Sequence, residues 1–157
     1  MKAKIVLVPL DGSPMAEEAL GTAIGALRAG ATLLLIRAVE AHGSPFEELS
    51  ERQLAAIQEA ESYLVGVADR LNSMGVKNVT TSVWYGAPVE SIADAARYRN
   101  AELIVMTTHG RSGLRRLLLG SVAEGVLRAT TTPVLLLRPI KSAPVLDPTF
   151  WEEAAHV

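Results

Sequence analysis

The sequence of 157 residues contains no cysteine, few aromatic residues and no long apolar run. Without cysteine the chain can form neither disulfides nor thiolate metal sites, which is compatible with a reducing compartment. No run approaches the roughly 18 consecutive apolar residues that a membrane-spanning helix needs. The residues Met1–Lys4 lead straight into an apolar run without a signal-like segment. We therefore expect a cytoplasmic protein that has no membrane partner.

Charge and histidine are sparse as well. The formal net charge is −2, so no broad electrostatic attraction to nucleic acid is expected. The histidines His42, His109 and His156 are far apart in the sequence, which argues against a His-built metal site. The chain does have 49% hydrophobic residues, enough at this length for one domain with a substantial core.

Apolar runs alternate with helix-like segments along the chain. Five runs predict strands, the third more exposed than the others: Lys4–Leu10, Leu33–Ile36, Val79–Tyr85, Glu102–Met106 and Val134–Leu137. Helical periodicity between them predicts helices over 13–30, 50–75, 86–96 and 122–129. The expected N-caps are Ser13 before Pro14, Ser50 in a capping box with Gln53, and Ser121 in a capping box with Glu124. Gly30 is expected to close the first helix.

This alternation predicts an α/β fold of the Rossmann-like kind. Its core is an open five-stranded parallel sheet with right-handed crossovers and helices on both faces. We expect residues 1–139 to form this domain and residues 140–157 to be a C-terminal extension. A helix start at Asp147–Pro148 precedes Phe150 and Trp151, so a short docked helix is favoured over a disordered tail.

The stretch 106–122 follows a predicted strand and precedes a predicted helix. It contains Gly110, Gly113 and Gly120, and three arginines add positive charge nearby. Glycines let the backbone approach a phosphate, and the unpaired N–H groups of a helix start point toward it. An ordinary strand-to-helix connection with turn glycines is the alternative interpretation of the same residues.

The spacing in this stretch favours the phosphate interpretation. The sequence T-H-G-R-S-G-L-R-R-L-L-L-G-S-V-A-E resembles the nucleotide-binding signature of the universal stress protein family, G-x2-G-x9-G-[S/T]. Gly110, the nine-residue gap and Gly120–Ser121 match, whereas Thr107 stands where the first glycine is expected. V-P-L-D-G-S and T-T-P-V-L-L-L-R also look like family motifs, so the resemblance covers nearly all of residues 3–138. It implies the strand order 3-2-1-4-5.

The resemblance also implies a ligand, namely ATP or another adenine nucleotide, alone or with Mg²⁺ or Mn²⁺. The adenine would meet the backbone near Ala38, and the phosphates would lie on the glycine loop and the following helix start. The expected nucleotide-binding residues are Pro9, Leu10, Asp11, Ala38, Met106, Thr107, Gly110, Arg111, Ser112, Gly113, Gly120, Ser121 and Val122. Taken alone, Asp11 in Asp-Gly-Ser is more typical of an ordinary turn.

Thr107 has two interpretations. If glycine is needed there for a positive φ, a β-branched residue would be strained. If the position is still extended, threonine fits a strand well, and its hydroxyl could donate to a phosphate. Thr107 directly continues the apolar run that ends at Met106, so we expect a φ below zero and ATP binding that persists.

The resemblance implies a regulatory protein of the stress response that binds nucleotide and signals through its bound state rather than by turnover. No P-loop is present, and His109 has no acid–base or nucleophile partner in the pattern, so we expect no enzyme beyond very slow ATP hydrolysis. The alternative is a dimeric interaction or protective module of the same fold that does not bind nucleotide. In either case the apolar edge strand Pro133–Arg138 predicts a homodimer, because such an edge needs a cover.

Overall fold

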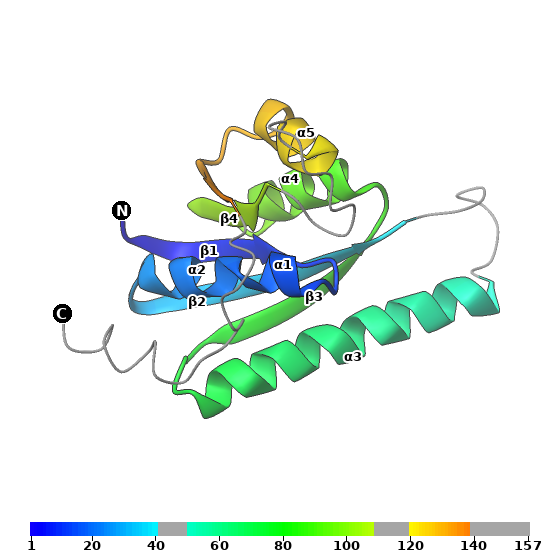
Figure 1. The fold of residues 1–157 in the computed structure, drawn as a ribbon, viewed down its shortest axis with the longest axis horizontal. Helices are drawn as coiled ribbons and strands as arrows, with labels where there is room; N and C mark the ends of the chain where they lie inside the picture. Colours follow the sequence, from blue (N-terminus) through cyan, green and yellow to red (C-terminus); the bar gives the residue numbers. More distant parts are fainter. Residues whose placement is uncertain (41–49, 109–119, 139–157) are drawn as a thin grey trace.

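The computed structural model describes residues 1–40, 50–108 and 120–138, which form one sheet and its covering helices (Figure 1). The strands are β1 (Ala3–Pro9), β2 (Leu27–Val39), β3 (Val79–Tyr85), β4 (Leu103–Thr107) and β5 (Val134–Leu137). The helices are α1 (Pro14–Glu17), α2 (Ala19–Gly25), α3 (Glu51–Ser73), α4 (Pro88–Tyr98) and α5 (Ser121–Ala129). The sheet order is β3-β2-β1-β4-β5 and every pair is parallel, so the predicted fold and strand order are confirmed.

The central strands are apolar on both faces because each face meets a different core. On β1, Val6 and Val8 belong to the core shared with α1, α2 and α3. Leu7 points the other way and belongs to the core shared with α4 and α5. β2 and β4 divide their side chains in the same manner, so helices cover both faces of the sheet, as Figure 1 shows. This two-sided burial explains the absence of polar alternation in their sequences.

The two edge strands are less buried than the centre. β3 has no buried residue, whereas β1, β2 and β4 do, so the prediction of a strand more exposed than the two before it is confirmed. β5 lies at the other edge, and its Leu135 is an exposed large apolar side chain.

The first predicted helix is wrong at its end. It breaks into α1 and α2, and Ala26 is the C-cap of α2. The chain then enters β2 at Leu27, because the Ala3 N–H donates to the Ala26 carbonyl at 2.8 Å and Ala3 pairs with Leu27. Gly30, with φ of 72°, therefore lies in an irregular start of the strand, where the pairing with β1 shifts register.

The predicted caps have mixed outcomes. Ser13 accepts a hydrogen bond from the Ala16 N–H at 3.2 Å, and the capping box of Ser50 is present. The capping box predicted at Ser121 is wrong, because Gly120 is the N-cap of α5 and Ser121 is its first helical residue. The Gly120 N–H donates to the Thr108 carbonyl at 2.8 Å, so Gly120 is bonded to the residue that follows β4, directly before the first helical residue. The C-terminal extension, with its predicted docked helix, lies outside the described residues.

Candidate functional site

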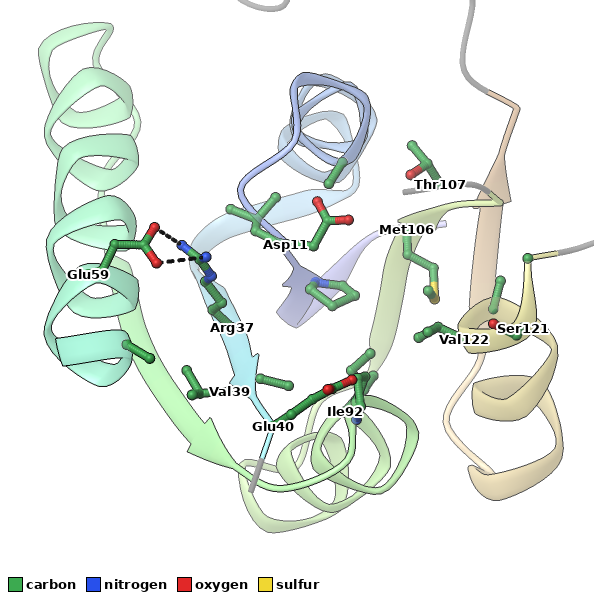
Figure 2. A pocket seen from close by; sticks show the side chains of 18 of the residues that line it. Asp11, Arg37, Val39, Glu40, Glu59, Ile92, Met106, Thr107, Ser121 and Val122 are labelled. Carbon is green, nitrogen blue, oxygen red and sulfur yellow. Dashed lines mark hydrogen bonds and ion pairs between the residues drawn. The ribbon is translucent and has the colours of Figure 1, made fainter. Parts of the chain in front are cut away.

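A cavity of about 900 Å³ lies at the carboxyl ends of the central strands. It opens where strand order reverses between β1 and β4, the position at which open α/β sheets bind ligands. Its described lining comes from the ends of three strands, β1, β2 and β4, from α1 and α3, and from the starts of α4 and α5 (Figure 2). The lining residues are Pro9, Leu10, Asp11, Ala16, Arg37, Ala38, Val39, Glu40, Ser50, Arg52, Gln53, Ala56, Glu59, Pro88, Ile92, Met106, Thr107, Thr108, Gly120, Ser121, Val122 and Ala123.

Nine of the predicted nucleotide-binding residues line this one cavity. They are Pro9, Leu10, Asp11, Ala38, Met106, Thr107, Gly120, Ser121 and Val122. The other four, Gly110, Arg111, Ser112 and Gly113, lie outside the described residues. The structure thus brings together residues from β1, β2, β4 and α5 that are up to 113 positions apart in sequence (9 to 122). That they bind nucleotide remains a prediction.

Asp11 forms a turn as well as part of the cavity wall. One of its carboxylate oxygens accepts hydrogen bonds from the Ser13 N–H at 2.9 Å and from the Ser13 hydroxyl at 2.6 Å. These bonds fix the turn between β1 and α1, which Gly12 passes with φ of 83°. Asp11 therefore forms the expected turn and also lines the cavity.

The β4 side of the cavity has the features of an anion site. Thr107 is buried, pairs with Leu137 as the last residue of β4, and is not among the described residues with positive φ. Its predicted extended backbone is confirmed. No side chain caps α5, and in the described part of the chain no acceptor is bonded to the N–H groups of Ser121, Val122 and Ala123. A helix start of this kind favours a negatively charged ligand group.

The β2 side is built around Arg37, which the sequence analysis did not single out as functional. Its side chain is only 8% exposed and forms a two-pronged ion pair with Glu59 of α3, at 3.0 Å and 3.2 Å (Figure 2). The guanidinium carbon also lies 5.2 Å from the centre of the Tyr63 ring. The one available signal was an arginine directly after the buried run Leu33–Ile36.

Tyr63 connects this pair to a second buried polar group. Its hydroxyl donates to Glu17 at 2.8 Å, and Arg70 holds the other oxygen of that carboxylate at 2.6 Å. Burial, the hydrogen bond to Glu17 and the negative charge of Glu17 raise the pKa of Tyr63 well above its usual value. The phenol therefore stays neutral, donates to Glu17, and offers an uncharged ring to Arg37.

The lining of the cavity is partly apolar and partly polar. Leu10, Val39, Ile92 and Met106 are its apolar members, and Asp11, Arg37 and the α5 start are polar or charged. Within the described ranges no group of three or more acidic or histidine side chains could hold a metal ion. Such a cavity can take a ligand with a flat apolar part and an anionic part.

The comparisons with known proteins decide the family. Residues 2–138 match the family described as the universal stress protein family. The chain belongs to this family. A universal stress protein of Methanocaldococcus jannaschii is 36% identical over 145 residues, which cover 88% of this chain and 84% of the relative.

Solved structures agree with the family assignment. The protein MJ0577 superimposes with a TM-score of 0.73 at 25% identity, covering 90% of this chain and all of that one. A universal stress protein in complex with cAMP superimposes with a TM-score of 0.66 at 25% identity, covering 88% of this chain and 98% of that one. Among the described helices of this universal stress protein, none combines the length and the apolarity that crossing a membrane requires.

Proposed function

We propose that this universal stress protein binds an adenine nucleotide, ATP in the first place, in the cavity between β1 and β4. The observation that carries the proposal is the convergence of nine residues, expected from the family resemblance, on one cavity beside the uncapped start of α5. The phosphates would lie against the N–H groups of that helix start. The base would lie between the backbone at Ala38 and the apolar wall at Ile92 and Met106.

Two further observations support the proposal. Thr107 keeps an extended backbone, so the departure from the family pattern does not distort the end of β4. A relative of similar size and fold has been solved in complex with cAMP, which is itself an adenine nucleotide. The proposal includes a companion Mg²⁺ or Mn²⁺ for ATP, held mainly by the phosphates. We expect the nucleotide-bound protein to act as a regulator in a stress response and not to hydrolyse ATP efficiently.

A thermal unfolding series tests the proposal. Ligand that binds only the folded chain stabilises it by roughly 2.7 kcal/mol when present at about 100 times its dissociation constant. We expect ATP, with and without Mg²⁺, to raise the unfolding temperature in a concentration-dependent way, with cAMP as the second adenine nucleotide and inorganic triphosphate as the control. A rise with triphosphate equal to that with ATP would mean that the cavity binds phosphate alone and would contradict the proposal.

A further inference from the structure

Arg37 is a buried cation on the wall of the cavity, at the end of β2. It is followed by Ala38, whose backbone is the expected adenine contact, and it lines the cavity together with Glu59. Nine-tenths of its side chain is removed from solvent. A guanidinium is seldom buried to this extent without a specific set of partners.

Three contacts hold the guanidinium in one orientation. Glu59 accepts hydrogen bonds from both terminal nitrogens, and the Tyr63 ring lies at 5.2 Å. A Cβ atom on Gly12 would lie 3.5 Å from Cζ, Nη1 and Nη2 alike, so the flat face of the guanidinium covers Gly12. Arg37 is therefore pre-organised, and a ligand that meets it need not order its side chain.

Most of the donors of Arg37 remain available. Arginine has five N–H groups, and Glu59 takes two of them. Across residues 1–40, 50–108 and 120–138, no other acceptor is bonded to this side chain. Hydrogen bonds from a charged donor are among the stronger ones in proteins, so a ligand atom that accepts one here gains affinity.

The charges around Arg37 determine which kind of acceptor fits. Glu59 already pairs with the guanidinium through both of its oxygens. A phosphate placed here would meet the negative charge of Glu59, whereas the start of α5 offers it unpaired N–H groups. An uncharged nitrogen or oxygen acceptor fits the β2 side better.

We propose that Arg37 is a specificity-determining residue that donates a hydrogen bond to an uncharged acceptor of the nucleoside. The acceptor is a ring nitrogen of the base or a hydroxyl oxygen of the ribose, and the phosphates lie elsewhere. This inference rests on the proposed function and deepens it, because it says which part of the nucleotide the β2 side recognises.

Calorimetric titration with ATP analogues tests the inference. The ligands are ATP and its 1-deaza, 3-deaza, 7-deaza, 2′-deoxy and 3′-deoxy forms, each lacking one candidate acceptor. We expect one analogue to bind wild type roughly tenfold to a hundredfold more weakly than ATP. That difference should disappear in Arg37→Met, which lacks the donor. Arg97→Met, which removes an exposed arginine paired with Asp94 at 2.8 Å, should behave as wild type.

The analogue that responds identifies the acceptor as belonging to the base or the ribose. Equal analogue losses in wild type and Arg37→Met would overturn the inference, because those losses would then come from other contacts. If Arg37→Met does not fold, Arg37→Lys replaces it. Lysine keeps the charge and can still donate but lacks the planar fork, so the difference should shrink rather than disappear. The inference would also be overturned if wild type bound all five analogues with affinities within about twofold of its affinity for ATP. Failure of wild type to bind ATP would instead contradict the proposed function.

Discussion

At the scale of single residues, Thr107 is where this chain departs from the glycine pattern of its family. Its backbone is that of the last strand residue, and its side chain is buried at the cavity wall. Glycine at such a position supplies room in the cavity, since no positive φ is required here. The departure therefore changes the wall of the site without changing the course of the chain.

Thr107→Gly should consequently bind ATP with an affinity within about tenfold of wild type. The variant should also be less stable by roughly 0.5–1 kcal/mol, because glycine in a strand loses more conformational freedom on folding. Calorimetric titration and urea unfolding measure the two effects. Binding that is absent in wild type and restored by glycine would show that Thr107 closes the site.

Glu17 is the residue whose loss should matter most for stability outside the cavity. It is buried, accepts hydrogen bonds from Tyr63 and Arg70, and so connects α1 to α3. We expect Glu17→Ala to lower the free energy of unfolding by about 2–3 kcal/mol, since a buried hydrogen-bonded carboxylate is removed.

The matched control for this prediction is Glu124→Ala. Glu124 also lies in the first turn of its helix and pairs with an arginine, Arg128, at 2.8 Å, but its side chain is 49% exposed. An exposed pair of this kind should contribute no more than about 0.5 kcal/mol. Equal losses in the two variants, measured by urea unfolding, would mean that the Glu17 cluster does not connect the helices.

At the scale of elements, the sequence predicted the strands and helices whose limits depend only on neighbouring residues. The ranges of β3 and β5 were correct as predicted, because a compact apolar or β-branched run bounded by turn residues marks a strand. The predicted end of the first helix was wrong. The backbone hydrogen bond from Ala3 to Ala26 places the chain beside β1, so β2 begins before Gly30. The cap of α5 moved to Gly120 for a similar reason, its bond to Thr108 across a long connection. Both errors come from contacts between segments that a local pattern does not contain.

The edge strand β5 gives a prediction at this scale. It is the last strand of the described sheet, and two large apolar side chains are exposed on it and on the helix before it, Leu135 on β5 and Leu127 on α5. We expect a homodimer at micromolar concentration, paired through β5, and a monomer for Leu135→Lys. Val65→Lys, at an exposed position of α3, is the control and should remain dimeric. Sedimentation equilibrium measures this, and a monomeric wild type would defeat the prediction.

At the scale of the whole molecule, the cavity exists only after the sheet is assembled. β1, β2 and β4 lie side by side in it, although α3, β3 and α4 separate β2 from β4 in sequence. The strand order was predicted from the family resemblance. Because that order places β1 beside β4, it also predicted that Asp11 and Thr107 lie at one cavity. The pairing of Arg37 with Glu59 could not, because it depends on how α3 packs against the end of β2. The β4 side of the cavity and Ala38 on β2 were thus predictable from the resemblance, and the Arg37–Glu59 pair was not.

The central claim is that this cavity binds ATP. The most direct test is a calorimetric titration of ATP into wild type and into Gly120→Val. Gly120 has φ of −58° and ψ of 149°, so valine is compatible with its backbone and should obstruct the phosphate position while the fold persists. The account predicts saturable binding of one ATP per chain in wild type and no detectable binding in the variant. Absence of binding in wild type, or equal affinity in both proteins, would contradict it, and absence would favour the interaction module that does not bind nucleotide.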